Sequence, residues 1–372
     1  MDTGEILGWH FATRQPVRVR WAGGFITHLE PVATPPPSDL WIAPSLCDLQ
    51  INGYAGVDFQ QDDLTIDDLL RAARGLRAAG CAKFLLTLVT DDWSRLMARL
   101  RHLRSLRAES AELQAAIIGW HVEGPFLSAE PGFHGAHDPA LMLDPRPEHI
   151  RELRSLTGDD PLLLTVAPER AGALATIELA ASLGITVSLG HTDASAEILA
   201  RAVRAGATMF THLGNACPQE LNRHDNILWR VFDTPGLTVS LIPDRMHVSP
   251  ALFRLQHRVL GNSIYYTTDA MAAAGAPPGR YTIGKLTVEV GADQIVRQPG
   301  KTNFAGSALH PVEGVFRAAE MLRCSWQETW SRLSETPAKL MGLRNEIAVG
   351  QPATFCRLKL APDGRLLELK TE

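Results

Sequence analysis

Three side chains that can bind a metal ion stand at the ends of short apolar runs in this sequence. Glu123, His191 and His212 each close or follow a β-branched-rich stretch of strand length. One carboxylate and two imidazoles are the ligand class of a catalytic zinc site, which keeps one position open for water. In a parallel barrel the C-terminal ends of all strands meet at one mouth, so ligands from three strands can converge there. The pattern therefore predicts a divalent metal site and a hydrolase.

A further carboxylate, Asp269, closes the apolar run that begins at Tyr265. Barrel active sites draw acids and bases from several strand ends, so Asp269 is a candidate general base, with a helix N-cap as the alternative. Gln50 and Asn52 stand at the end of the first expected barrel strand. Amides bind zinc poorly, and we therefore expect one metal ion per chain, by preference zinc.

The elements that must position these side chains alternate between helix and strand. Apolar residues recur at helical spacing between Thr65 and Gly80, and the buried strand Phe84–Val89 follows. The alternation recurs with strand candidates at 117–121, 162–166, 185–189, 208–211, 237–242 and 263–268. Successive β/α units of this kind favour an α/β fold of the (β/α)8 TIM-like barrel type over a doubly wound sheet.

The two ends of the chain have a different pattern. Short alternating stretches at 17–21 and 25–29, separated by glycines, and a similar hairpin pattern near the C-terminus predict antiparallel strands. We expect them to form one small β-sandwich domain built from both termini. The predicted division is 1–43 and 345–372 for the two halves of that domain and 44–344 for the barrel.

Composition narrows the class of function. The 372 residues suit one barrel plus a small appendage, and a net charge of −5 with scattered basic residues gives no reason to expect nucleic acid. The longest apolar runs are of strand length, so no membrane partner is expected. Five cysteines without CxxC spacing, and an N-terminus without a basic-then-apolar leader, predict reduced thiols and a cytoplasmic location.

The motifs, taken in order, resemble those of the N-acetylglucosamine-6-phosphate deacetylase family of the amidohydrolase superfamily. They are Asp48-Leu-Gln-Ile-Asn-Gly-Tyr-Ala-Gly56, His121-Val-Glu-Gly-Pro-Phe126, Gly135-Ala-His-Asp-Pro139, Thr165-Val-Ala-Pro-Glu169, Gly190-His-Thr-Asp-Ala194, Thr211-His-Leu-Gly-Asn-Ala216, Asp244-Arg-Met-His-Val248, Thr268-Asp-Ala270 and Ala305-Gly-Ser307. The series covers roughly the whole barrel. It implies hydrolysis of the acetamide of N-acetylglucosamine 6-phosphate to glucosamine 6-phosphate and acetate.

The resemblance also implies residue roles. Glu123, His191 and His212 would hold the metal, His137 would contact the acyl oxygen, and Asp269 would be the general base. Gln50 and Asn52 match the family's one-metal variant, whose members carry amides at the second-metal position. The residues implied to grip the sugar phosphate are Asn215, Ala216, Arg223 and His247, with Arg223 reaching in from the neighbouring subunit of a homodimer. Phe304 would lie near the acyl or sugar face.

Several departures from the family pattern keep alternatives open. His224 and Asp225 follow Arg223 in place of an acidic-Pro-Gly turn, and Arg245 replaces a small residue. His224 and Asp225 either pair with each other or mark a changed sugar pocket. His134 competes with His137 for the oxyanion role. The alternative functions are an amidohydrolase for another N-acylated amino sugar, such as N-acetylgalactosamine 6-phosphate or an unphosphorylated amide, and a catalytically silent binding barrel.

Overall fold

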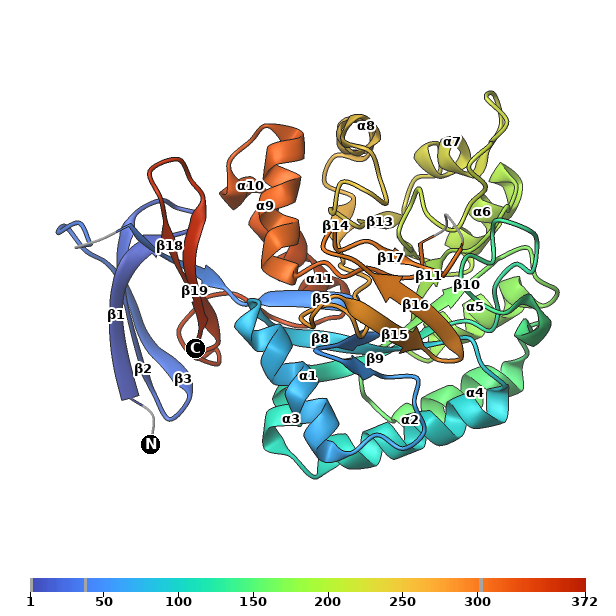
Figure 1. Cartoon of the computed structure of the whole chain (residues 1–372), viewed down its shortest axis with the longest axis horizontal. Helices are drawn as coiled ribbons and strands as arrows, with labels where there is room; N and C mark the ends of the chain where they lie inside the picture. Colours follow the sequence, from blue (N-terminus) through green and yellow to red (C-terminus); the bar gives the residue numbers. More distant parts are fainter. Residues whose placement is uncertain (1–2, 37–38, 301–303) are drawn as a thin grey trace.

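The computed structural model describes residues 3–36, 39–300 and 304–372. Eight parallel strands form the central sheet, in the order β14-β13-β12-β11-β10-β9-β8-β5. The two edge strands approach each other through a parallel bridge between Ile51 and Ala270, so the sheet nearly closes on itself (Figure 1). The strand order follows the chain order, with helices packed outside, and the expected (β/α)8 barrel is confirmed.

The barrel strands are β5 (Leu46–Ile51), β8 (Cys81–Val89), β9 (Ile117–Glu123), β10 (Leu162–Val166), β11 (Thr186–Leu189), β12 (Met209–Phe210), β13 (Thr238–Leu241) and β14 (Ile264–Tyr266). The helices are α1 (Ile66–Ala78), α2 (Trp93–Ala108), α3 (Ala111–Ala116), α4 (Pro147–Thr157), α5 (Ala173–Ser182), α6 (Ala196–Arg204), α7 (Ile227–Phe232), α8 (Pro250–Leu260), α9 (Pro311–Leu322), α10 (Trp326–Trp330) and α11 (Glu335–Leu340). Within the described ranges, none of these helices is both long and apolar enough to cross a membrane.

Helix α1 shows how the sequence sets an element's boundaries. Thr65 is the N-cap: its hydroxyl accepts from the backbone N–H of Asp68, and the Asp68 carboxylate accepts from the Thr65 N–H at 2.9 Å. This reciprocal pair satisfies two of the N–H groups that a helix start leaves open. The helix buries Leu69 and Leu76 against the sheet and ends before Gly80, whose φ is +90°. The predicted helix between Thr65 and Gly80 is confirmed.

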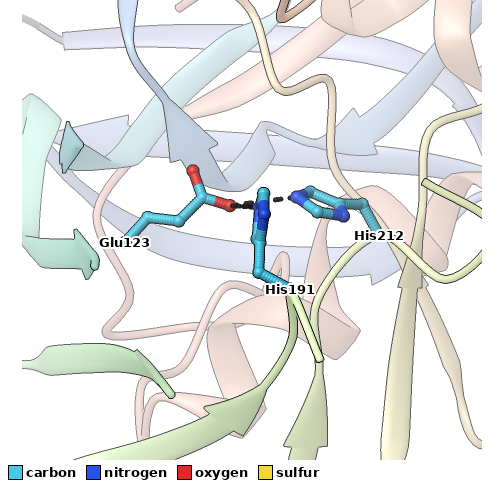
Figure 2. Close-up of side chains that lie close together, drawn as sticks. All are labelled: Glu123, His191 and His212. Carbon is cyan, nitrogen blue, oxygen red and sulfur yellow. Dashed lines mark hydrogen bonds and ion pairs between the residues drawn. The ribbon is translucent and has the colours of Figure 1, made fainter. Parts of the chain in front are cut away.

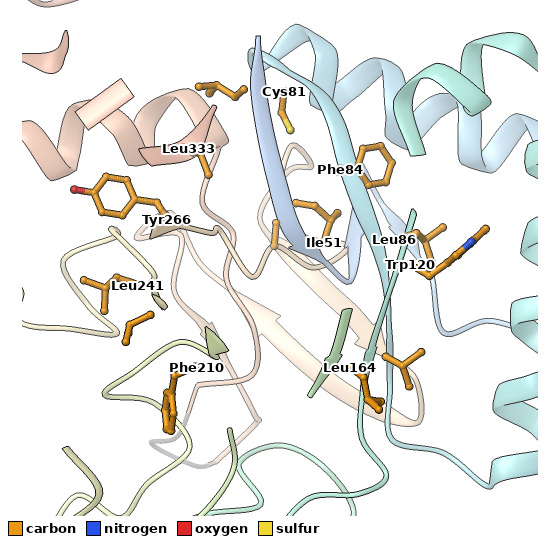
Figure 3. Packing of buried hydrophobic residues seen from close by; sticks show 14 of the residues in the cluster. Ile51, Cys81, Phe84, Leu86, Trp120, Leu164, Phe210, Leu241, Tyr266 and Leu333 are labelled. Carbon is orange, nitrogen blue, oxygen red and sulfur yellow. The ribbon is translucent and has the colours of Figure 1, made fainter. Parts of the chain in front are cut away.

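The barrel strands divide their side chains between two layers. On β8, Phe84 and Leu86 pack outward among the residues under the helices (Figure 3). Leu85 belongs to a separate cluster with Leu49 and Leu163 inside the barrel. Above the apolar side chains inside the barrel, a buried polar layer crosses it. His121 Nε2 lies 2.8 Å from Thr165 Oγ1, which lies 3.0 Å from Thr211 Oγ1. The next residues along the same strands form the mouth, so the polar layer supports the candidate site from below.

The two chain ends form a single small sheet beside the barrel (Figure 1). Its order is β19-β18-β4-β1-β2-β3, and the strands are β1 (Thr3–His10), β2 (Pro16–Ala22), β3 (Phe25–Pro31), β4 (Leu40–Pro44), β18 (Phe355–Leu360) and β19 (Leu366–Thr371). Ile26 exchanges backbone hydrogen bonds with Gly350 and Gln351, so the sheet curls around Val19, Ile42 and Phe355. The expected β-domain from both termini is confirmed, while its boundaries at 43 and 345 stay a prediction.

Two small sheets lie beside the mouth and were not predicted. The first consists of β15 (Gly279–Ile283), β16 (Leu286–Val290) and β17 (Val296–Arg297), and the second of β6 (Gly53–Tyr54) and β7 (Val57–Asp58). Asp58 joins them: its Oδ2 accepts from Thr282 Oγ1 at 2.8 Å and from the Gly284 N–H at 2.9 Å. The β15–β16 hairpin is thereby fixed over the barrel mouth.

Candidate active site

Glu123, His191 and His212 meet at the mouth of the barrel, as the sequence predicts (Figure 2). Their ligand-capable atoms lie within 4.8 Å of one another, and all three side chains are buried. Glu123 Oε1 lies 2.9 Å from His212 Nε2 and 3.3 Å from His191 Nε2. One carboxylate oxygen therefore faces both imidazole nitrogens.

The hydrogen bonds of His191 suit a metal ligand. Its Nδ1 lies 3.0 Å from the backbone oxygen of Phe133, and because that carbonyl can only accept, Nδ1 carries the proton. Nε2 is then an unprotonated lone pair, buried and without a hydrogen-bond partner among the described residues. A backbone carbonyl on the second nitrogen is the usual support of a metal-binding histidine. The donor set thus fits a divalent ion.

Two of the three groups in the cluster have the charge state that a metal ligand set needs. Burial alone would raise the pKa of Glu123, but His191 and His212 outweigh it and hold the pKa well below its ordinary value. Burial lowers the pKa of His191, so this imidazole is neutral. Burial also acts to lower the pKa of His212, but the Glu123 carboxylate overrides it and raises this pKa.

Three residues of the mouth share an unusual backbone conformation. His191, His212 and Asp269 have φ values of 51°, 32° and 53°, each just after a barrel strand. A residue other than glycine in this left-handed region costs about 1–3 kcal/mol, and such strain concentrates at functional sites. Because the turn comes within a few residues of the end of each strand, it directs all three side chains into the mouth.

Asp269 is a buried carboxyl with a perturbed pKa. Burial, together with the nearby negative charge of Glu123, raises its pKa to about 7. Its backbone oxygen accepts from the Ser307 N–H at 2.8 Å. A Cβ added at Gly306 would lie 3.2 Å from that same oxygen, so the close approach favours glycine. The Ala305-Gly-Ser307 motif therefore holds the strand end that carries Asp269.

The amides Gln50 and Asn52 each donate to a carboxylate. Gln50 Nε2 lies 2.9 Å from Glu123 Oε1, and Asn52 Nδ2 lies 2.7 Å from Asp269 Oδ1. The N–H groups thus take the carboxylate lone pairs that a second cation would need. This arrangement agrees with the expectation of a single metal ion.

His137 lies next to the cluster, and the His134 side chain forms a hydrogen bond with the backbone of His137. His137 Nε2 lies 3.8 Å from Glu123 Oε2, and its ring packs edge-on against His191 at 4.6 Å. Burial and the neighbouring His191 lower its pKa to about 3, so the ring is neutral. His134 Nδ1 instead bonds the His137 backbone oxygen at 3.1 Å. Of the two candidates for the oxyanion role, His137 is the closer to the metal ligands.

A cavity of about 610 Å³ opens above these residues, and its wall includes most of the predicted substrate contacts. Asn215, Ala216, His247 and Phe304 all line it. His247 is held by the buried Asp244, whose Oδ2 lies 2.6 Å from His247 Nδ1, and its ring lies 4.9 Å from that of Phe304. The cavity thus joins the metal ligands to the residues predicted to bind the sugar phosphate.

Arg223 lies outside the described lining of this cavity, on an exposed loop of its own chain. Its Nε donates to His224 Nε2 at 3.0 Å, whereas Asp225 pairs with Arg230 at 2.6 Å. His224 and Asp225 therefore do not pair with each other, unlike one of the two interpretations of the sequence. Arg245 also turns away from the cavity, toward Glu320.

Two residues of the site were missed by sequence reasoning. Thr90 follows β8 and places its Oγ1 2.8 Å from His137 Nδ1. Its position directly after a buried strand is the signal that identified the metal ligands, but a threonine there carries no distinctive chemistry. Ile283 lines the cavity from the tip of the β15–β16 hairpin. The alternating residues around Gly284 could have indicated that hairpin.

Comparison with known proteins agrees with this geometry. No family model matches the chain. The N-acetylglucosamine-6-phosphate deacetylase of Vibrio furnissii is 30% identical over 84% of this chain and 76% of its own length. The enzyme of the same name from Danio rerio is 32% identical over 84% of this chain and 79% of its own length.

A solved structure extends the likeness to the whole fold. It is a variant of N-acetyl-D-glucosamine-6-phosphate deacetylase from Mycobacterium smegmatis in complex with N-acetyl-D-glucosamine-6-phosphate. The two structures match with a TM-score of 0.88 and 28% sequence identity, over 100% of this chain and 99% of the other. The barrel mouth joins the Glu-His-His cluster to Asp269, a carboxyl with a raised pKa. By its sequence identity to these relatives, the chain belongs to the N-acetylglucosamine-6-phosphate deacetylase family.

Proposed function

We propose that the protein hydrolyses the acetamide of N-acetylglucosamine 6-phosphate and releases glucosamine 6-phosphate and acetate. The observation that carries the proposal is the single cavity that contains Glu123, His191, His212 and Asp269 together with the predicted sugar contacts. The two curated relatives named for this activity support the substrate. The buried cluster supports a divalent metal, and we propose zinc because one carboxylate with two imidazoles is a common zinc set.

An acetamide is a poor electrophile with a poor leaving group, so its hydrolysis has three chemical requirements. They are an activated water, a proton transfer to the departing amine and stabilisation of the developing oxyanion. Glu123, His191 and His212 would hold a divalent ion, and its Lewis acidity would lower the pKa of water and polarise a carbonyl group. Asp269 accepts the proton of the attacking water and returns it to the departing amine. A pKa near 7 suits both steps, and such catalysis typically contributes about 10²–10⁴-fold.

His137 meets the third requirement, the stabilisation of the developing oxyanion. To donate a hydrogen bond from Nε2, the neutral ring must carry its proton on that nitrogen. The Thr90 hydroxyl, 2.8 Å from Nδ1, supports this tautomer because it can donate to Nδ1. Thr90 is a positioning residue in this scheme, while His137 contacts the substrate.

We further propose that Asn215, Ala216 and His247 bind the sugar phosphate within one chain and that Arg223 completes the site from the partner of a homodimer. The exposed position of Arg223, outside the cavity of its own chain as described, supports a role in a second subunit. The five cysteines are free thiols, which supports a reducing compartment such as the cytoplasm.

An acetate-release assay with a panel of sugars tests the function. The metal-loaded protein is assayed with N-acetylglucosamine 6-phosphate, with its galactosamine counterpart and with the two unphosphorylated sugars. Glu123→Gln, which lacks one metal ligand, is the control. The first substrate should give the highest kcat/KM. A preference for an unphosphorylated amide would instead support the alternative amidohydrolase, and no acetate from any sugar would support the silent barrel.

A further inference from the structure

A second cavity, of about 300 Å³, adjoins the active-site cavity. Val89, Ala136, His137 and Ile283 line both cavities, so these four residues form the partition between them. Three of the four are apolar. Beyond the partition the apolar Leu141 and Leu286 border the second cavity, and Asp91 and Arg99 pair there at 3.0 Å. Its remaining border is polar and consists of Gln60, Thr90, Asp138 and Lys285, with the backbone of Gly284.

The partition lies at the end of the active site where an acyl group would be. Asn215 and His247 follow β12 and β13, whereas Val89 ends β8, on the other side of the eight-stranded order. A sugar held at β12 and β13, with its acyl oxygen at His137, would direct its acyl methyl group toward β8. The His137 ring itself has Nε2 toward Glu123 and Nδ1 toward Thr90, which lines the second cavity.

The hairpin holds Ile283 in a fixed position within the partition. Its two neighbours are tied to one buried carboxylate, because Asp58 Oδ2 accepts from Thr282 Oγ1 at 2.8 Å and from the Gly284 N–H at 2.9 Å. The Ile283 side chain packs with Ala136 against the small apolar cluster that includes Val288. Because the Ile283 side chain is held in place, it can exclude a larger ligand by size.

We propose that the second cavity is an acyl-chain subsite that Ile283 closes, so that Ile283 restricts the enzyme to short N-acyl groups. Once opened, the second cavity would take the acyl chain of an N-acylated amino sugar whose acyl group is longer than acetyl. This inference rests on the proposed function, because it takes His137 as the residue at the acyl oxygen. Removal of the Ile283 side chain joins the two cavities and admits a longer alkyl chain.

The test compares N-acetyl, N-propionyl and N-butyryl glucosamine 6-phosphate as substrates of the parent protein and of Ile283→Ala. The ratio of kcat/KM for butyryl over acetyl should rise by about 10-fold or more, the usual effect of a methylene in a hydrophobic pocket. Ile283→Val should move the ratio in the same direction by less, and it serves if the alanine variant does not fold. The matched control is Ile295→Ala, an isoleucine just before β17 that lines neither cavity, and it should keep the parent ratio.

A second pair of measurements assigns the gain to the second cavity. In an Ile283→Ala background, Leu141→Trp should fill that cavity and reverse the gain with the butyryl substrate. Binding of butyrate and acetate to the metal-loaded proteins, measured by calorimetry, should show the same shift toward butyrate in Ile283→Ala. This readout needs no turnover, so a parent that releases no acetate would contradict the proposed function alone. Unchanged butyryl-to-acetyl ratios in both Ile283 variants, with unchanged carboxylate binding, would overturn the subsite.

Discussion

The side-chain amide of Asn52 donates a hydrogen bond to Asp269 Oδ1 across 2.7 Å. One oxygen of the carboxyl is thereby engaged and its orientation fixed, which leaves Oδ2 as the oxygen that can exchange a proton with water or the amine. A hydrogen bond from an amide also favours the ionised form, but burial and Glu123 outweigh it and the pKa stays raised. Asn52 thus orients the carboxyl without abolishing its basicity.

The first prediction is that Asp269→Asn keeps the fold and the metal but loses turnover by about 10²-fold or more. The variant's amide oxygen can still accept from Asn52, whereas it cannot take a proton from water. Metal content and kcat are measured on the same preparation. Turnover within a few fold of the parent would show that Asp269 is a structural cap.

The second prediction concerns the stability of the metal-free protein, measured by urea unfolding in the presence of a chelator. The pKa of Asp269 in the folded protein is about 7, above its ordinary value of 3.8. Between these values the folded state retains a proton that the unfolded chain has lost, so this group's contribution to the free energy of unfolding falls as pH rises from about 4 to 7. Asp269→Asn removes that contribution.

The variant and the parent should therefore be similar in stability near pH 4.5, and the variant should be more stable by about 1 kcal/mol or more at pH 8. Other titrating groups are common to both proteins and largely cancel in the difference. A difference that is the same at both pH values would contradict the raised pKa.

The third prediction is one tightly held divalent ion per chain, measured by elemental analysis after desalting. His191→Ala and His212→Ala should each lose it, because two protein ligands hold a dication poorly. His134→Ala is the matched control, since this histidine lines the same cavity but bonds the His137 backbone oxygen. Two tight ions per chain would show that the amides of Gln50 and Asn52 do not prevent a second site.

The fourth prediction tests Thr90. Thr90→Val keeps the shape of the side chain but removes its hydroxyl, so His137 loses the partner that favours the Nε2 proton. We expect kcat/KM to fall by about 10-fold or more, by analogy with the cost of losing the hydrogen-bond partner of a metal-binding histidine. Thr90→Ser should restore most of the activity, since it retains the hydroxyl. A serine variant as impaired as the valine variant would assign Thr90 to packing.

Sequence reasoning predicted the barrel because the helix and strand signals of its β/α units are local. The helix that begins at Thr65 and the apolar strand at 162–166 depend only on neighbouring residues, and both occur in the structure as expected. The convergence of Glu123, His191 and His212 was also predictable, because parallel strands place their C-terminal ends at one mouth. The unusual φ values at these ends were not, since no pattern of residue types announces them.

The parts that escaped prediction depend on contacts between distant segments. Asp58 and Gly284 lie far apart in the chain, yet their hydrogen bond fixes the hairpin that carries Ile283. The alternation at 279–290 is a strand signal, but it lies inside the last β/α unit, between β14 and α9. The direction of Arg245 likewise depends on Glu320, a residue of α9.

The last prediction concerns the phosphate. If Arg223 of one subunit binds the 6-phosphate in the other, Arg223→Ala should weaken transition-state binding by about 1.5–3 kcal/mol, or roughly 10- to 150-fold in kcat/KM. The loss should disappear with the unphosphorylated sugar, because the guanidinium then has no charged partner. Arg230→Ala is the matched control: this arginine pairs with Asp225 and Asp193, so its loss should affect both substrates alike.

A mixed dimer separates a contribution from the partner subunit from one within the chain. Arg223→Ala chains and Asp269→Asn chains are each impaired alone, but a dimer of one of each contains a site with its own Asp269 and the partner's Arg223. Mixing the two proteins under conditions that exchange subunits should therefore recover part of the activity. If the mixture gains nothing while Arg223→Ala still weakens only the phosphorylated substrate, the arginine acts within its own chain. Equal losses with both substrates would instead mean that Arg223 does not bind the phosphate.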